Sequence, residues 1–199
     1  FLCNFTNIYI GKQRPKVLIK IKKLLKKNNS SIYYPNLWRL IKVKNNFFYK
    51  DKKIKIKLAT KYIRSRGLLE NLCLAIKIAL DQKIDKKIII KTIPKIKFQA
   101  RIEFIKKGKI IKKIKKNEKL LIDGCHSKVS AKNLSDYLKT LKKPIYGIWG
   151  MTKNKDPNKF IKQFNGIFKK IITVPIENEK ASLSKKILLK ISKKNNFET

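Results

Sequence analysis

The chain has 199 residues and a formal net charge of +40, because 52 Lys and Arg residues stand against only 12 Asp and Glu residues. No apolar run is long enough to span a bilayer and the N-terminus lacks the order of a signal peptide, so we expect no membrane partner. The three cysteines show no C-x-x-C spacing, which argues against a zinc or disulfide framework and favours a reducing cytoplasm.

The charge would ordinarily indicate nucleic acid as a partner. Only five of the basic residues are Arg, and Lys is spread through every segment, as expected of a very AT-rich coding sequence. We therefore expect no specific nucleic-acid partner. The alternative, a basic nucleic-acid-binding α/β protein, rests on the segment 42–53, where the aromatic residues 47–49 interrupt a basic run and could stack on bases. A surface hairpin with an aromatic inner face is the other interpretation of this segment.

The first half of the chain predicts helices and short strands. We expect a strand over 5–10, a helix from Pro15 that ends at 28–31, strands over 37–43, 46–49 and 54–58, and a second helix over 68–80. Asn71 lies in the first turns of this second helix. Because a helical Asn competes for backbone hydrogen bonds, the position indicates either a solvent-facing side chain or a functional one. A domain boundary is expected near Lys97.

The second half predicts a hairpin followed by alternating strands and helices. We expect hairpin strands over 101–105 and 109–114, strands over 120–122, 145–150 and 170–176, and helices over 127–141 and 182–191. A further helix should carry Phe160, Ile161, Phe164 and Phe168. This order is typical of an α/β fold with a mostly parallel sheet and right-handed crossovers.

The stretch from Leu120 to Ser127 carries the strongest sign of chemistry. An apolar strand ends in Asp123-Gly124, the only His of the chain follows at position 126, and a helix begins at once. Ligands of open α/β sheets bind outside the carboxyl ends of strands, beside helix N-termini that favour anions. Asp-Gly is also a common turn pair, and His126 could be a capping or exposed residue.

Five motifs, taken in order, resemble the folylpolyglutamate synthase and dihydrofolate synthase family, relatives of the Mur ligases. They are Gly11-Lys12-Gln13, Glu70-Asn71, Arg101, Asp123-Gly124-Cys125-His126-Ser127, and Gly150-Met151 followed by Lys155-Asp156. The resemblance implies that residues 1–97 are the end of a P-loop-type, ATP-binding domain. Residues 98–199 would then be a Rossmann-like Mur ligase C-terminal domain with a mostly parallel sheet, itself incomplete.

The resemblance implies a ligase of folate biosynthesis and one-carbon metabolism, acting as a monomer. It would use ATP and Mg²⁺ to phosphorylate the carboxylate of dihydropteroate or folate, and L-glutamate would attack the resulting acyl phosphate. Asn71 and Arg101 would contact the nucleotide, and Asp123 would hold the ribose hydroxyls. His126 would lie near the transferred phosphate or the incoming glutamate, and no residue of this chain would bind metal.

Some positions depart from the family's usual residues. Gly67-Leu68 stands for His-Gln, Gln99-Ala100 for Pro-Gly, Cys125 for Ala and Ser127 for Asn. The sequence also contains no G-x-x-x-x-G-K-[ST] motif. We therefore expect the phosphate-binding loop and the magnesium ligands to lie upstream of Phe1, and this piece to be inactive by itself. Another Mur-type amino-acid ligase is the alternative within the same class of enzyme.

Overall fold

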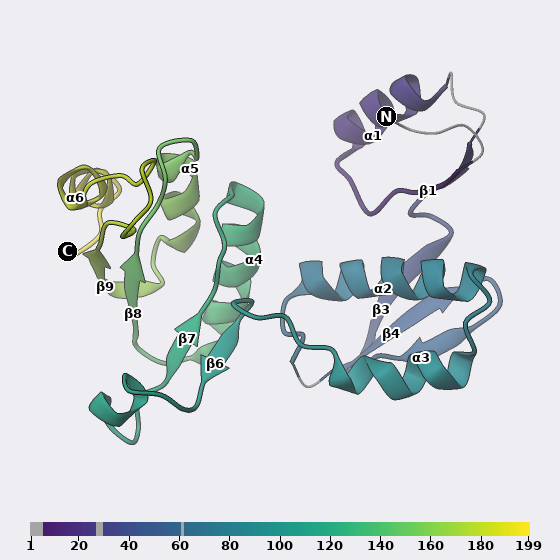
Figure 1. Ribbon diagram of the computed structural model, residues 1–199, viewed down its shortest axis with the longest axis horizontal. Helices are drawn as coiled ribbons and strands as arrows, with labels where there is room; N and C mark the ends of the chain where they lie inside the picture. The colour runs from purple at the N-terminus through teal and green to yellow at the C-terminus, as the bar shows by residue number, and fades with distance from the viewer. Residues whose placement is uncertain (1–5, 27–29, 61) are drawn as a thin grey trace. The chain divides into compact units, whose positions relative to one another are not determined.

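The computed structural model describes residues 6–26, 30–60 and 62–199. The chain forms two compact units, Phe1–Lys97 and Phe98–Thr199, each with its own buried apolar core. Both units combine helices with short sheets (Figure 1), so the predicted α/β class is confirmed. Of the helices in the described ranges, none combines the length and the hydropathy that a bilayer-spanning segment needs.

The first unit begins with a strand–helix–strand element. Strands β1 (Asn7–Tyr9) and β2 (Ser31–Tyr33) pair in parallel, and helix α1 (Pro15–Leu25) makes the crossover between them. The Tyr9 ring stacks on the Tyr33 ring with centroids 4.6 Å apart, and the Tyr9 hydroxyl donates to Asp81 Oδ2 at 2.9 Å. Burial and this carboxylate raise the pKa of Tyr9 to about 12. The predicted Pro15 helix is confirmed and ends at Leu25. Of the stretch 28–31 that was expected to end it, residues 28–29 lie outside the described residues and Ser31 begins β2.

An antiparallel sheet and two helices complete the first unit. They are β3 (Trp38–Val43), β4 (Asn46–Asp51), β5 (Lys55–Lys57), α2 (Arg66–Asp81), α3 (Lys86–Thr92) and the short 3₁₀ turn η1 (Ile93–Lys95). The alternation of Ile and Lys around β5 buries Ile56 and leaves the neighbouring lysines in solvent. Helix α2 begins where the Ser65 hydroxyl accepts the Leu68 N–H.

The second unit alternates strands and helices. Its elements are β6 (Glu103–Ile105), η2 (Ile111–Lys113), β7 (Leu120–Ile122), α4 (Lys128–Leu138), η3 (Lys139–Leu141), β8 (Ile145–Trp149), α5 (Pro157–Ile161), η4 (Lys162–Phe164), β9 (Phe168–Thr173) and α6 (Lys185–Lys194). Strands β6 and β7 are antiparallel, whereas β8 and β9 are parallel and joined through α5. The parallel pair is the crossover unit that the strand–helix alternation predicts.

Helices α4, α5 and α6 share one core with β8 and β9. Trp149 stacks on Phe160 with ring centroids 5.7 Å apart, and its indole N–H donates to the buried Ser192 hydroxyl at 3.3 Å. Alternate residues of the strands point the other way, so Ile148 and Ile172 expose 68% and 51% of their surface. The helices therefore cover one face of the β8–β9 sheet.

Two predictions about the second unit were wrong. Residues 109–114 do not pair with 101–105, because β6 pairs with β7 and the segment between them forms turns and η2. The apolar residues of 109–114 face solvent in part, with Ile110 at 63% exposure, whereas Leu121 of β7 packs against the core of the second unit. Phe168 lies in β9 instead of a helix, since the helical segment ends with η4 at Phe164.

Gly150 follows β8, and the space around it admits no side chain. A Cβ atom there would lie 2.8 Å from the carbonyl oxygen of Val174 and 3.1 Å from Ile176 Cγ1. The backbone that follows β9 therefore passes directly over Gly150. The neighbouring Met151 is 3% exposed and belongs to the core of the second unit.

We expect Gly150→Ala to lower the free energy of unfolding of the second unit by about 1–3 kcal/mol, because a methyl group must displace backbone. Urea unfolding followed by Trp149 fluorescence would measure this in a chain carrying Trp38→Phe, since these are the only two tryptophans. Lys155→Ala, at an exposed position in the turn region that follows Gly150, is the control and should change stability by less than about 0.5 kcal/mol. Equal stability of the two variants would contradict the close approach of the Val174 backbone to Gly150.

Candidate functional site

The Asp123 carboxylate joins two loops at the end of β7. Its Oδ1 accepts the N–H of Cys125 and its Oδ2 accepts the N–H of Ile102, both at 2.8 Å. The side chain is only 8% exposed. Two short bonds from backbone amides hold a carboxylate firmly and satisfy donors that would otherwise be unpaired. Asp123 is therefore a clamp between the loop before β6 and the loop after β7.

The loop before β6 has an unusual backbone. Ala100 and Ile102 have φ angles of 50° and 49°, a left-handed conformation that costs a residue other than glycine about 1–2 kcal/mol. Three hydrogen bonds hold it, since Ala100 N–H donates to Glu103 Oε2 at 2.7 Å, Gly124 N–H donates to Ala100 O at 2.8 Å, and Ile102 is bonded to Asp123. Such strain persists only where surrounding contacts enforce it, and it is frequent at functional sites.

Arg101 lies between these two strained residues. Its Nη1 is 3.9 Å from Asp123 Oδ1, and the side chain is 39% exposed. A Cβ on Gly124 would lie 3.1 Å from the same Nη1, so a glycine there lets the guanidinium rest against the backbone. Arg carries a permanent charge and a planar set of donors that suit phosphate or carboxylate. The exposed part of this guanidinium is available to an anion.

His126 and Ser127 start helix α4 beside Arg101's loop. The His126 Nδ1 lies 3.1 Å from the Gly124 carbonyl oxygen, and because a carbonyl only accepts, Nδ1 carries a proton. In the neutral ring the exposed Nε2 is then an acceptor. The Ser127 hydroxyl accepts the Ser130 N–H at 3.2 Å and the Ser130 hydroxyl accepts the Ser127 N–H at 3.0 Å, a capping box that orients the helix start.

Cys125 is not a nucleophile in this arrangement. Burial of the thiol and the neighbouring Asp123 carboxylate raise the pKa of Cys125 far above its usual range. Burial likewise raises the pKa of Cys73 to about 12, so both thiols stay protonated near neutral pH. Cys3 lies outside the described residues. Within the described part of the chain, no group of three or more His, Cys, Asp and Glu side chains could hold a metal ion.

Asn71 belongs to the first unit, where it is exposed on α2. The preceding residue, Glu70, accepts a hydrogen bond from Lys12 Nζ at 3.3 Å and one from Arg66 Nε at 3.2 Å. The first two predicted motifs, around Gly11 and around Asn71, are therefore neighbours within this unit. The exposure of Asn71 agrees with a solvent-facing side chain and leaves its amide accessible to a ligand.

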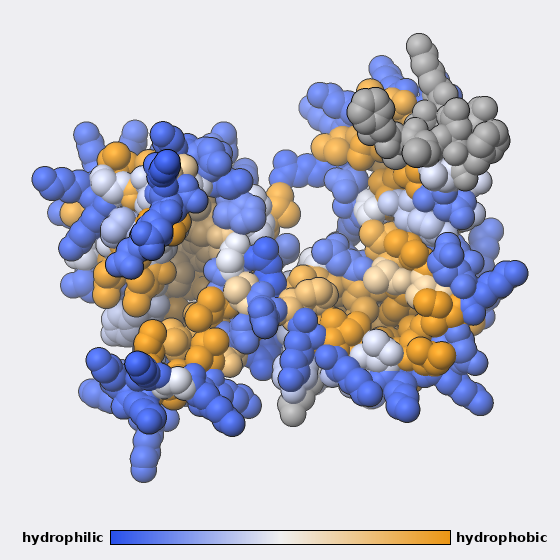
Figure 2. All heavy atoms as spheres, in the orientation of Figure 1, coloured by the Kyte–Doolittle hydropathy of each residue, from blue (hydrophilic) through white to orange (hydrophobic). Residues whose placement is uncertain are grey.

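The structure argues against base stacking by the aromatic residues 47–49. Tyr49 is fully buried, and its hydroxyl donates to Asp51 Oδ2 at 2.6 Å. Phe47 and Phe48 are half-buried, and Lys42 Nζ and Lys55 Nζ lie 6.0 and 4.5 Å from their ring centroids. Hydrophilic side chains are spread over the visible surface instead of being gathered on one element (Figure 2). Phe47 and Tyr49 thus form an aromatic inner face of this hairpin, whereas Phe48 does not belong to that core.

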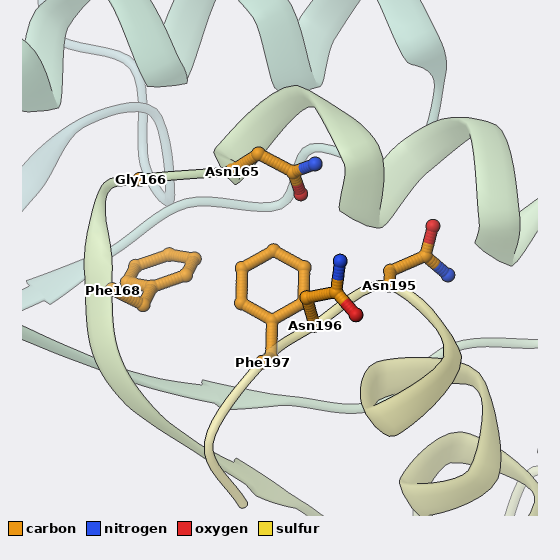
Figure 3. A pocket seen from close by; sticks show the side chains of 6 residues that line it. All are labelled: Asn165, Gly166, Phe168, Asn195, Asn196 and Phe197. Atoms are coloured by element: carbon orange, nitrogen blue, oxygen red, sulfur yellow. The ribbon is translucent and has the colours of Figure 1, made fainter.

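The second unit also contains a cavity of about 220 Å³ (Figure 3). It is lined by residues of the segments 165–168 and 195–197, and not by Arg101, Asp123 or His126. Its lining residues are Asn165, Gly166, Phe168, Asn195, Asn196 and Phe197. The Asn195 amide already donates to Asn158 Oδ1 and to the Ile191 carbonyl, and Phe197 is part of the core. The lining offers no charged group, so the loop end of β7 is the better candidate site.

The structure brings together three of the four predicted site residues, Arg101, Asp123 and His126. Glu103 belongs to the same arrangement but was not singled out from the sequence. The available signal for Glu103 was an acid two residues after Arg101 in a chain with only 12 acidic residues. Asp156, in the last predicted motif, instead caps α5 by accepting the Lys159 N–H at 2.9 Å.

Neither models of protein families nor curated protein sequences match this chain. Among solved structures, the folylpolyglutamate synthase of Mycobacterium tuberculosis, complexed with ADP and AMPPCP, superposes on 95% of the chain with a TM-score of 0.79 and 12% identity. A bifunctional folylpolyglutamate synthase/dihydrofolate synthase with Mn, AMPPNP and L-glutamate bound matches 93% of it (TM-score 0.73, 14% identity). The folylpolyglutamate synthase of Thermotoga maritima matches 94% (TM-score 0.67, 20% identity).

At these identities, what the chain shares with the three proteins is the fold. This chain spans 43%, 42% and 44% of their respective lengths. The resemblance to folylpolyglutamate synthases that the motifs predict is therefore confirmed as a resemblance in structure over nearly the whole chain.

Removing the clamp should destabilise the second unit. We expect Asp123→Ala to lower the free energy of unfolding by about 2–3 kcal/mol, because the amides of Ile102 and Cys125 lose their acceptor. Asp123→Asn keeps one acceptor oxygen and should cost less. Asp136→Ala, which breaks only an exposed pair with Lys132, is the control and should cost less than about 0.5 kcal/mol. Urea unfolding of the four proteins measures this, and equal effects of Asp123→Ala and Asp136→Ala would contradict the clamp.

Proposed function

We propose that this chain is part of an ATP-dependent ligase that adds L-glutamate to dihydropteroate or folate. The observation that carries the proposal is the Arg101 guanidinium, held by a strained loop against Gly124 and beside Asp123, in a fold shared with folylpolyglutamate synthases. Two of those proteins were solved with adenine nucleotides, and one of these also with L-glutamate. A fixed, partly exposed cation is what binding of a nucleotide phosphate requires.

Each predicted residue has a place in this proposal. Arg101 would bind phosphate oxygens of the nucleotide through its exposed donors. The Asp123 oxygens each accept one amide and keep a second lone pair, which could accept a ribose hydroxyl. His126 would present Nε2 to the transferred phosphate or the incoming glutamate, since Nδ1 faces the Gly124 carbonyl. Asn71 would contact the nucleotide through its amide, as the motif resemblance implies.

The proposed reaction has two steps. A carboxylate oxygen of the pterin-containing substrate attacks the γ-phosphorus of ATP, and the bond from that phosphorus to the bridging oxygen breaks, which releases ADP. The amine of glutamate then attacks the acyl carbon, phosphate leaves, and the amine loses a proton. Since both steps gather anionic groups, positive charge must offset their repulsion. We assign Arg101 to this role and assign no magnesium ligand to the described residues.

The choice between dihydrofolate synthase and folylpolyglutamate synthase activity does not affect these roles. Another Mur-type amino-acid ligase would use the same nucleotide contacts with a different acceptor. The proposed roles of Arg101 and Asp123 therefore concern nucleotide binding and do not depend on which acceptor is used.

We expect Arg101→Ala to weaken ADP binding at least about tenfold, which corresponds to about 1.4 kcal/mol, because it removes the fixed cation. Arg39→Ala, which removes an exposed Arg from β3, is matched in charge and should leave the affinity unchanged. Isothermal titration calorimetry at low and high salt measures both, since weak attraction to a chain of net charge +40 fades with salt whereas site binding persists. An equal loss in the two variants would refute a site at Arg101.

A further inference from the structure

Glu103 directs its side chain back to the loop that carries Arg101. Its Oε2 accepts the Ala100 N–H at 2.7 Å, while its backbone pairs with Ile122 in the β6–β7 sheet. Glu103 is therefore fixed in the β6–β7 sheet, and its side chain restrains Ala100 in the loop. The proposed reaction does not otherwise use Glu103.

Two carboxylates restrain the backbone on both sides of Arg101. Glu103 accepts the amide of Ala100 and Asp123 accepts the amide of Ile102, and these are the two residues with left-handed φ angles. A β-branched residue such as Ile102 is rarely found in that conformation. Both amides are bonded in this strained conformation, so the two carboxylates together hold the direction in which the Arg101 side chain leaves the backbone.

The position of the Arg101 guanidinium depends on that direction. Its Nη1 lies 3.1 Å from where a Gly124 Cβ would be, and Gly124 in turn donates its N–H to the Ala100 carbonyl. If Ala100 relaxed to a negative φ, this carbonyl would turn away and the contact between the guanidinium and Gly124 would be lost. Among the described residues, Glu103 is the acid that accepts the Ala100 amide.

We propose that Glu103 is a positioning residue that orients the Arg101 guanidinium toward the phosphates of the bound nucleotide. The ligand in this statement rests on the proposed function, whereas the orientation rests on the loop geometry. Glu103 acts through Arg101 and touches no reacting atom.

The chain provides a closely matched control. Glu118 accepts the N–H of Lys115, three residues earlier, with its Oε2 at 2.9 Å. This is the same kind of bond at the same spacing as that from Glu103 to Ala100, and it lies in the segment between β6 and β7. Glu118→Ala therefore removes an equal charge and an equal hydrogen bond without altering residues 100–103.

The orientation is tested first without any nucleotide. We expect Glu103→Ala to accelerate hydrogen exchange of the Gly124 amide and to abolish nuclear Overhauser contacts between the Arg101 guanidinium and Gly124. Glu103→Gln, which keeps an acceptor oxygen, should retain them, and Glu118→Ala should leave them unchanged. Retained contacts in Glu103→Ala would overturn the proposal.

The consequence for binding is tested with ADP. We expect Glu103→Ala to weaken ADP binding about tenfold, Glu103→Gln to restore most of the affinity, and Glu118→Ala to have no effect. In a chain already carrying Arg101→Ala, Glu103→Ala should cause no further loss, because a residue that acts through another shows strongly non-additive effects. An additive loss would indicate general destabilisation and would overturn the proposal.

The two proposals fail in different ways. If the wild-type chain binds ADP and Glu103→Ala binds it equally well, the positioning role is wrong while the nucleotide site stands. If the wild-type chain does not bind ADP although the contacts between Arg101 and Gly124 depend on Glu103, the proposed function is wrong and the positioning of Arg101 stands.

Discussion

The arrangement at the end of β7 depends on one interaction, the pair of hydrogen bonds from the amides of Ile102 and Cys125 to the Asp123 carboxylate. This carboxylate joins segments separated by about 20 residues and compensates part of the backbone strain at Ile102. Since β6 and β7 pair over only three residues each, their sheet alone gives the adjoining loops little support. The clamp fixes the loop that presents Arg101 and, through Cys125, the start of the segment that carries His126.

Most of the few acidic side chains of this chain accept a hydrogen bond from a backbone N–H. Seven of the 12 Asp and Glu side chains accept a backbone N–H, and these are Asp51, Asp85, Glu103, Glu118, Asp123, Asp156 and Glu179. Lysine cannot replace them there, because an ammonium group has no acceptor. Lys can therefore occupy most solvent-facing positions, while an acid is retained where a turn or a helix start needs an acceptor for a backbone N–H. This agrees with the spread of hydrophilic side chains over the surface (Figure 2).

Periodicity predicted most elements of the second unit, since apolar residues of α4 and β8 recur at helical and strand spacing. It failed where partners are distant in sequence. The segment 109–114 has strand-like apolar residues, but the pairing partner of β6 is β7, and a local pattern carries no information about that choice. Phe168 continued the helical spacing of Phe160 and Phe164, yet a 3₁₀ turn ends the helix and places Phe168 in β9.

The candidate site was also predicted from the sequence only in part. The strand end, the Asp-Gly pair and the single His were visible in the sequence, and the structure places Arg101 beside them. The positive φ angles of Ala100 and Ile102 and the role of Glu103 were not visible, because neither Ala nor Ile signals a left-handed conformation. Ser127, which differs from the Asn usual in the family that the motifs resemble, forms the capping box of α4.

If the end of β7 binds a nucleotide through Arg101, titration of the ¹⁵N-labelled chain with ADP should reveal it in the ¹H–¹⁵N chemical shifts. We expect saturable shifts centred on the amides of residues 100–103 and 123–127, which persist when salt is raised. Shifts spread over the lysine-rich surface that vanish with salt, with these two segments unchanged, would contradict it.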